Sequence, residues 1–311
     1  MKLLFILDPL DSLKPYKDTS LAIMRAAIER GHAVFVCQQH AIFLRQAIVH
    51  VHAQPFAFAE GAQWYSIGMP ATYHPKEFDA VLMRKDPPFD NEYLYSTYLL
   101  ELATQQGARV LNHPSAIRNW NEKLAVTRFP QFTPAFIVTS QYALIREFLA
   151  EHGDIVVKPL DGMGGSGVFR LTQHDPNIGA ILETITQLEQ RTVMAQRYLP
   201  AIAQGDKRII LINGDPLPYA LARIPKAGET RGNLAAGGKG VAQVLSAQDL
   251  HIAQTIGPIV KQHGLFLVGL DVIGDHLTEI NVTSPTGMVE IAAQTDCQPA
   301  QIFIQALEAL H

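Results

Sequence analysis

A lysine followed by a run of glycines is the stretch of this chain best suited to binding an anion. Lys158 leads through a proline to Asp161, and the chain continues Gly162-Met163-Gly164-Gly165-Ser166-Gly167. Glycines have no side chain to block a ligand, so their backbone N–H groups can reach the oxygens of a polyphosphate, with the Lys158 ammonium beside them. We interpret 158–167 as a phosphate-binding loop; a flexible hairpin tip is the alternative.

Two better-known phosphate motifs do not fit this loop. Gly162, Gly164 and Gly167 match the spacing G-x-G-x-x-G, but that dinucleotide fingerprint must open a helix. The segments 154–157 and 168–172 on either side are short and apolar, which predicts strands. A Walker A loop ends in Gly-Lys-Ser/Thr, which is absent here. The loop is therefore expected to connect two strands.

Two apolar segments near the carboxyl end, 266–273 and 277–284, predict a β-hairpin around a three-residue turn. A turn of this length places Ile273 opposite Leu277. Since side chains alternate between the faces of a strand, this register gathers the apolar residues on one face and the polar residues on the other.

The polar face of this hairpin offers three oxygen ligands: Asp271, Glu279 opposite it, and Asn281. Carboxylate and amide oxygens suit Mg²⁺, which completes its shell with water and phosphates; Mn²⁺ is the ion that could replace it. A polar face turned to solvent is the alternative. Together with the glycine loop and Lys158, the hairpin favours binding of a magnesium nucleotide.

Charged residues also follow a strand of the first domain. Arg84 and Asp86 come directly after a strand ending at Met83 and are followed by Pro87-Pro88. Ligands of parallel sheets bind beyond the carboxyl ends of the strands, so these charges suit a substrate carboxylate or amine. The alternative is a turn whose charges face water.

The glycine-rich segment 225–240 contains one arginine and two lysines. We expect a mobile lid that closes to exclude water from the reacting groups; an ordinary surface loop is the alternative.

The elements that position these residues alternate in the first third of the chain. This pattern predicts a parallel sheet with helices on both faces, while 41–75 suggests only one or two short strands. The expected strands are 3–7, 33–37, 78–83 and 109–111, and the expected helices are 20–30 and 93–106.

The remainder predicts a small lobe and a further sheet. We place domains at 1–120, 121–200 and 201–311, with 121–200 as a lid. The expected helices are 115–127, 141–152, 178–187 and 247–263, and the expected strands, besides those above, are 133–138, 192–200, 206–212 and 217–224, the last two joined by a turn at Asn213-Gly214-Asp215.

Composition narrows the class of protein. With 311 residues, 48% of them hydrophobic, the chain can bury more than one core. A net charge of -4 gives no footprint for nucleic acid or an anionic membrane, so neither is an expected partner. The two cysteines, Cys37 and Cys297, fit free thiols in a reducing compartment. Without a signal peptide or membrane-spanning run, we expect a cytoplasmic protein.

Taken together, these motifs resemble the bacterial glutathione synthetase family of the ATP-grasp superfamily. The resemblance implies an α/β ATP-grasp fold: an N-terminal Rossmann-like parallel-sheet domain, a small α+β lid and a C-terminal α+β catalytic domain. It covers most of the chain except 41–75 and the last twenty residues. The matching segments are Asp8-Pro9, 83–90, 121–124, 158–165, 194–196, 199–201, 205–208, 222–225, 228–238, 269–271 and 278–286.

The resemblance also implies an activity and a set of roles. The family joins γ-glutamylcysteine to glycine through an acyl phosphate while ATP becomes ADP and phosphate, and its members are typically homo-oligomers. Arg208 would stabilise the phosphoryl oxygens and the tetrahedral intermediate, while Arg223 would assist it or bind substrate. ATP would be bound by Lys123, Lys158, Asp161, Gly162, Gly164, Gly165, Ser166, Gly167, Gln196, Tyr198, Leu199 and Asp206; Mg²⁺ by Asp271, Glu279 and Asn281; and substrate by Arg84, Asp86, Arg231, Asn233 and Ser284.

Two other functions remain open at this point. Another ATP-grasp carboxylate–amine ligase would share the core motifs but leave 84–88 and 230–238 unexplained. An ATP-binding regulatory protein that lost catalysis would be expected to lack a metal ligand or Arg208. The sequence contains Arg208 and all three metal-ligand candidates, Asp271, Glu279 and Asn281.

Overall fold

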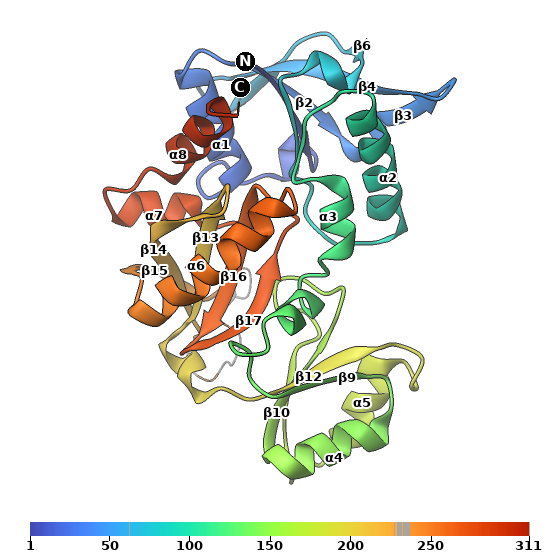
Figure 1. Cartoon of the computed structure of the whole chain (residues 1–311), viewed down its shortest axis with the longest axis vertical. Helices are drawn as coiled ribbons and strands as arrows, with labels where there is room; N and C mark the ends of the chain where they lie inside the picture. The colour runs from blue at the N-terminus through green and yellow to red at the C-terminus, as the bar shows by residue number, and fades with distance from the viewer. Residues whose placement is uncertain (62, 227, 229–231, 233–236, 311) are drawn as a thin grey trace.

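The computed structural model describes residues 1–310 except 62, 227, 229–231 and 233–236. The described chain forms three β-sheets in succession, with helices packed against them (Figure 1). None of the helices within this described part is both long and apolar enough to cross a membrane.

The N-terminal sheet has a parallel centre, as predicted. Its strands are β1 (Lys2–Leu7), β2 (Ala33–Gln38), β7 (Ala80–Met83) and β8 (Val110–Leu111), with β1 between β2 and β7. The last five residues of β1 are buried, which explains its unbroken apolar sequence. The predicted helices are α1 (Thr19–Glu29) and α2 (Asn91–Gln105).

The stretch 41–75 contains more structure than its sequence suggested. A long strand, β4 (Ile48–Phe58), pairs antiparallel with β2 and with three short strands, so the sheet as a whole is mixed. Val49, Val51 and Ala53 alternate inward along β4, the period expected of a strand with one buried face. The short strands are β3 (Ile42–Arg45), β5 (Tyr65–Ile67) and β6 (Ala71–Tyr73).

The helix predicted over 115–127 is wrong in its second half. Helix α3 (Pro114–Asn119) ends early, and a 3₁₀ helix, η4 (Leu124–Arg128), follows. The side chain of Asn121 accepts hydrogen bonds from the backbone N–H groups of Lys123 (3.2 Å) and Leu124 (3.0 Å). Because these bonds replace helical ones, the chain turns at Asn121.

The second sheet belongs to the small lobe, at the bottom of Figure 1. Its order is β11-β10-β12-β9 and every pairing is antiparallel. The glycine loop lies between β10 and β11, as predicted. The elements are β9 (Phe136–Thr139), α4 (Tyr142–His152), β10 (Asp154–Pro159), β11 (Phe169–Thr172), α5 (Ile178–Thr186) and β12 (Val193–Arg197), followed by the 3₁₀ helix η5 (Pro200–Gln204).

The third sheet has the order β15-β14-β13-β16-β17, again antiparallel throughout. Helix α6 (Ala247–Gln262) packs on it, and α7 (Met288–Gln294) leads to α8 (Pro299–Glu308), which returns to α1 (Figure 1). The strands are β13 (Asp206–Ile212), β14 (Asp215–Ile224), β15 (Lys239–Val244), β16 (Leu267–Ile273) and β17 (His276–Asn281). Whether the three sequence segments act as separate domains stays a prediction.

Candidate active site

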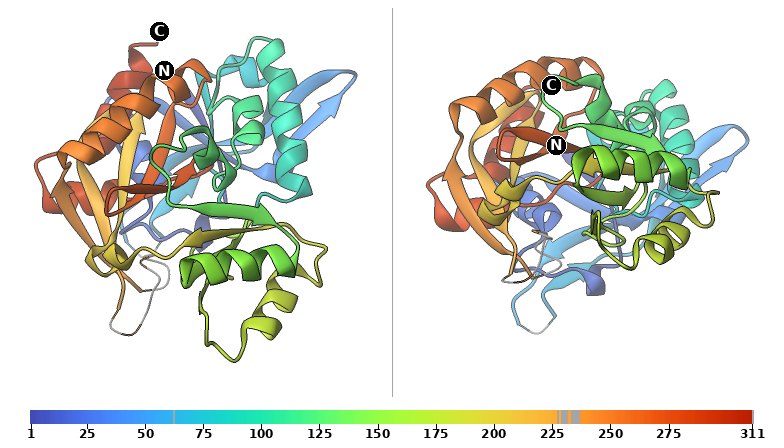
Figure 2. Two further views of the ribbon diagram at one scale, coloured as in Figure 1. Left: turned by 60° about the horizontal axis from the view of Figure 1, so that its bottom comes forward. Right: turned by 90° about the horizontal axis from the view of Figure 1, so that it is seen from below.

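A cavity of about 630 Å³ is lined by all three parts of the molecule. Its walls come from the lid strands β10 and β12, from β13, β14 and β17 of the third sheet, and from loops of the N-terminal sheet. The turned views in Figure 2 show the lid, in green, packed beside the third sheet, in orange. The glycine loop reaches this cavity from the lid through residues 162–166.

Strands β16 and β17 form the hairpin whose polar face was predicted to bind a metal, called the metal hairpin from here on. Their pairing has one irregularity. Asp271 lies opposite Glu279, as predicted. The predicted pairing of Ile273 with Leu277 is wrong, because the turn contains two residues instead of three. Thr278 is the extra residue on β17, a β-bulge that shifts the register back and brings the two carboxylates opposite each other.

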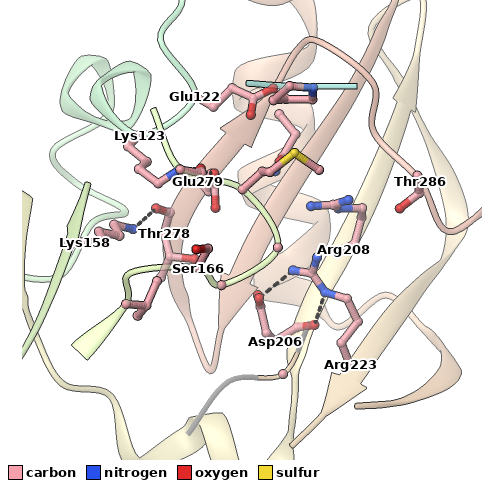
Figure 3. A pocket seen from close by; sticks show the side chains of 18 of the residues that line it. Glu122, Lys123, Lys158, Ser166, Asp206, Arg208, Arg223, Thr278, Glu279 and Thr286 are labelled. Carbon is pink, nitrogen blue, oxygen red and sulfur yellow. Dashed lines mark hydrogen bonds and ion pairs between the residues drawn. The ribbon is translucent and has the colours of Figure 1, made fainter. Parts of the chain in front are cut away.

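The bulge also provides an acceptor for Lys158. The Lys158 ammonium donates to the carbonyl oxygen of Thr278 at 3.0 Å (Figure 3). Only 7% of Lys158 is exposed, and burial lowers the pKa of its ammonium to about 8. One backbone oxygen offsets the burial of a cation only in part, so this group is well prepared to receive an anion.

Lys123 joins the glycine loop to the hairpin. Its ammonium donates to the carbonyl oxygen of Gly162 at 2.7 Å and to Glu279 Oε1 at 3.0 Å. Burial raises the pKa of Glu279, but the charges of Lys123 and Lys158 outweigh it and leave the pKa below its usual value. Gly162 itself is packed tightly: a Cβ there would lie 2.8 Å from Pro159 Cγ, so a larger residue would move the loop.

Asp271 is held by two arginines. Arg208 donates to both of its oxygens, from Nε at 2.9 Å and from Nη2 at 2.8 Å, and Arg223 Nη2 lies 2.8 Å from Oδ2. Burial works to raise the pKa of Asp271, but the two guanidinium groups outweigh it and hold the pKa well below the usual range. The predicted catalytic arginines therefore both adjoin a predicted metal ligand.

Asp206 extends this charge cluster towards the lid (Figure 3). Its Oδ2 accepts from Arg223 Nη2 at 2.5 Å, while Oδ1 is buried without a hydrogen-bond partner among the described residues. Burial raises the pKa of Asp206 to about 6, against the opposing charge of Arg223. An unsatisfied buried oxygen beside the cavity is suited to a hydroxyl donor from a ligand.

The donor set fits a hard divalent cation. Asp271 and Glu279 are cross-strand partners in the hairpin, and Asn281 donates through Nδ2 to Gly269 O at 3.3 Å, which leaves its amide oxygen to accept. Within the described part of the chain, no three His, Cys, Asp or Glu side chains are grouped to hold a metal. The fit thus rests on two carboxylates and an amide, with phosphate and water needed to complete the shell.

Most of the predicted nucleotide ligands line the cavity, and two do not. Asp161 forms an ion pair with Arg191 on the lid, and its side chain is 55% exposed. Gly167 lies beside the cavity and supplies a positive φ of 70° to the loop. The predicted ligands in the wall are Lys123, Lys158, Gly162, Gly164, Gly165, Ser166, Gln196, Tyr198, Leu199 and Asp206.

The predicted substrate residues divide into three groups. Asp86 and Ser284 line the cavity. Arg84 is buried behind it, where Nε donates to Ser20 Oγ and Nη2 to Pro285 O, both at 3.0 Å. Arg231 and Asn233 lie outside the described residues, as does much of the expected lid 225–240.

Several charged residues in the cavity wall were not identified from the sequence, among them Lys17, Glu122 and Arg170. Lys17 follows β1 at the carboxyl edge of the parallel sheet, which was a usable signal. The guanidinium of Arg170 stacks on the ring of Tyr198, with Cζ 3.7 Å from the ring centre. This contact depends on pairing across the lid sheet. Glu122 is the neighbour of Lys123 in the turn that the sequence suggested to be helical.

Comparison with known proteins gives one consistent result. Residues 1–118 match the family described as prokaryotic glutathione synthetase, N-terminal domain, and residues 122–296 match prokaryotic glutathione synthetase, ATP-grasp domain. The glutathione synthetase of Nitrosomonas europaea is 59% identical over 99% of this chain and 98% of its own length. That of Pseudomonas aeruginosa is 49% identical with the same coverage.

Solved structures support the fold. The D-cycloserine synthetase DcsG superposes with a TM-score of 0.70 at 17% identity, covering 99% of this chain and all of its own. The ATP-grasp ligase PsnB, solved with a precursor peptide and AMPPNP, gives a TM-score of 0.62 at 18% identity, covering 99% of this chain and 97% of its own. The fold is therefore ATP-grasp, as the sequence indicated.

Proposed function

This chain belongs to the prokaryotic glutathione synthetase family of ATP-dependent ligases, and we propose that it joins the cysteinyl carboxylate of γ-glutamylcysteine to the amine of glycine. The observation that carries the proposal is a cavity in which Lys123, Lys158, Arg208 and Arg223 surround the carboxylates of the metal hairpin. Such a concentration of cations under a glycine loop suits a polyphosphate and the oxyanions formed from it.

The nucleotide would lie between the lid and the third sheet. Lys123 and Lys158 are placed to bind the phosphates, and the backbone N–H groups of 162–166 to cover them. The segment from Gln196 to Leu199 offers backbone groups to the adenine. Asp206, with one buried oxygen free to accept, would receive a ribose hydroxyl.

The ligation would proceed in two steps. A carboxylate oxygen of the dipeptide bonds to the γ-phosphorus as the bond to the ADP oxygen breaks, which gives an acyl phosphate. The glycine amine then bonds to the acyl carbon, phosphate leaves, and the amine proton is released. Arg208 and Arg223 would stabilise the negative oxygens of both steps, since each guanidinium lies at the cavity.

Asp271, Glu279 and Asn281 would hold Mg²⁺, or Mn²⁺ in its place. A divalent cation bound there supplies neutralisation of the charge on the transferring phosphoryl group. Arg208 and Arg223 occupy Asp271 in the described structure, so they compensate its charge when no cation does.

The substrate end of the cavity would use Asp86 and Ser284, with Arg231 and Asn233 contributed by the lid 225–240. Asp86 offers a carboxylate to an amine, and Arg84 would act behind the wall by holding the Pro285 carbonyl. We further propose that the enzyme works in the cytoplasm as a homo-oligomer, without nucleic acid or membrane as a partner. The resemblance of its motifs to the family supports the oligomer.

The test is phosphate release from ATP and Mg²⁺ with γ-glutamylcysteine and glycine omitted in turn. We expect release only with both acceptors present, matched mole for mole by the tripeptide. Release that depends on a different pair of acceptors would retain the ligase and refute the substrates. Size-exclusion chromatography with light scattering tests the oligomer.

A further inference from the structure

One oxygen of Glu122 is saturated by the chain that follows β17. Glu122 Oε1 accepts from the backbone N–H of Val282 at 2.8 Å, and from the N–H and hydroxyl of Thr283 at 3.0 and 2.8 Å. The backbone carbonyl of Glu122 also accepts from the N–H of Ile280 at 2.9 Å. One residue therefore binds the chain on both sides of Asn281.

The same segment is held from its other side. Asn112, which is 6% exposed, donates from Nδ2 to the carbonyl oxygen of Val282 at 2.7 Å. Both polar groups of the Val282 backbone are thus bonded to side chains from the segment that enters the lid. We call this segment, 112–124, the lid connection, because it leads from the N-terminal sheet into the small lobe. Hydrogen bonds, and not apolar packing alone, join it to the end of the metal hairpin.

These bonds lie next to residues with assigned roles in the site. Asn281 and Ser284 flank the two residues that Glu122 binds, and both line the cavity. The next residue along the lid connection, Lys123, binds Glu279. Consecutive residues, Glu122 and Lys123, therefore bond at or beside two of the three residues assigned to the metal: Lys123 to Glu279 itself, and Glu122 to the two residues after Asn281. Figure 3 shows both side chains at the cavity.

We propose that Glu122 is a positioning residue for the ligation reaction. Acting as a hydrogen-bond acceptor, it fixes 280–283 so that Asn281 presents its amide oxygen to the metal and Ser284 its hydroxyl to the substrate. The inference rests on the proposed function, because it takes Asn281 as a metal ligand. Residues that orient a metal ligand typically contribute 10–100-fold to metal affinity or activity.

The experiment compares Glu122→Ala with Glu122→Gln. Glutamine retains an acceptor oxygen for all three bonds and removes only the charge, whereas alanine removes the acceptor. We measure Mn²⁺ binding to the protein in the presence of a non-hydrolysable ATP analogue by electron paramagnetic resonance, ADP binding without metal by calorimetry, and kcat and KM for ligation.

For Glu122→Ala we expect Mn²⁺ affinity and kcat to fall by about 10–100-fold, with metal-free ADP affinity unchanged because the adenine and phosphate contacts remain. For Glu122→Gln we expect both values within about threefold of the natural protein, since the acceptor is retained. Normal Mn²⁺ binding by a folded Glu122→Ala variant overturns the proposal. Equal losses in the two variants also overturn it, because the charge would then be what matters.

A second variant keeps the test decisive if Glu122→Ala does not fold. Thr283→Val removes one of the three donors to Glu122 Oε1 and keeps the two backbone bonds. We expect a loss of Mn²⁺ affinity of about 3–10-fold, and an unchanged affinity overturns the proposal. Failure of the natural protein to ligate γ-glutamylcysteine and glycine would refute the proposed function instead, so the two failures are distinguishable.

Discussion

Asp271 is 2% exposed, and its carboxylate is paired directly with Arg208 and Arg223. Removing one partner of a buried ion pair leaves the other charge uncompensated, which costs about 3–5 kcal/mol. We therefore expect Asp271→Asn to lower the free energy of unfolding by about that amount. Asp161→Asn is the matched control, because its pair with Arg191 is on the surface and should contribute about 0–1 kcal/mol. Urea denaturation measures both, and equal losses would contradict the expectation.

Glu279 allows a prediction about activity. Glu279→Ala should abolish turnover, because it removes a proposed metal ligand and the partner that holds Lys123 at the glycine loop. The fold should persist, since 23% of the Glu279 side chain is exposed at the cavity. Glu183→Ala, an exposed change on helix α5, is the control and should keep full activity. A thermal melt checks that the variants fold, and the ligation assay measures their turnover. Near-normal turnover by folded Glu279→Ala would contradict the assignment of Glu279 as a metal ligand.

The lowered pKa of Lys158 predicts that nucleotide binding depends on pH. Burial lowers the pKa of its ammonium to about 8, so it is charged below pH 8 and neutral above it. Metal-free ADP should bind more weakly as the pH rises through 8, approaching tenfold per pH unit. For stability the sign is opposite: between about pH 8 and the unfolded pKa near 10.4, the unfolded chain binds more protons, so stability rises with pH.

Calorimetric titration of ADP between pH 6 and 9.5 checks the binding. Lys158→Met removes the titrating group, so its weaker binding should show no change in slope around pH 8. The same slope in the natural protein and in Lys158→Met would assign the effect to another group.

At the scale of elements, Asn121 decides where the lid connection turns. Its side chain accepts from two backbone N–H groups and donates to Leu160 O at 3.1 Å, which joins the turn to the first part of the glycine loop, one residue after β10. Asn121→Ala should lower stability by about 1 kcal/mol, the value of a capping side chain, and raise the KM for ATP. Asn177→Ala is the control, since Asn177 precedes α5 without a side-chain cap and should change stability by under about 0.5 kcal/mol. Equal losses would remove Asn121 from this role.

The elements also show what sequence could predict. The lid hairpin, helices α4 and α5 and the Asn213-Gly214 turn follow from local periodicity and turn residues, and they formed within a few residues of the expected bounds. The bulge at Thr278 left no local signal, because a bulge is defined by pairing with a partner strand.

The sequence suggested one or two short strands in 41–75 and gave none a position, because three of the four strands are short and these three pair with β4. The candidate site could be predicted in outline because its motifs carry charge or glycine. Glu122 was missed as a functional residue because its importance depends on bonds to a segment 160 residues away.

At the scale of the whole molecule, the C-terminal end of the described chain packs against its N-terminal part. Helix α8 packs on α1, and one apolar core contains residues from the N-terminal sheet, α1 and α8. The ATP-grasp family match ends at residue 296, before α8 begins. The end of the chain therefore contributes to the core beneath the first domain, and the loops of that domain that line the cavity depend on it for support.

Two leucines near the end of the chain test this arrangement. Leu307 is fully buried in the shared core, whereas Leu310 is 37% exposed just beyond α8. Leu307→Ala should lower the free energy of unfolding by about 2–5 kcal/mol, and Leu310→Ala by under about 0.5 kcal/mol. Hydrogen exchange should quicken in α1 as well as α8 in the first variant, because the two helices share one core. If exchange quickens in α8 alone, the last helix is an appendage, and the first domain is stable without it.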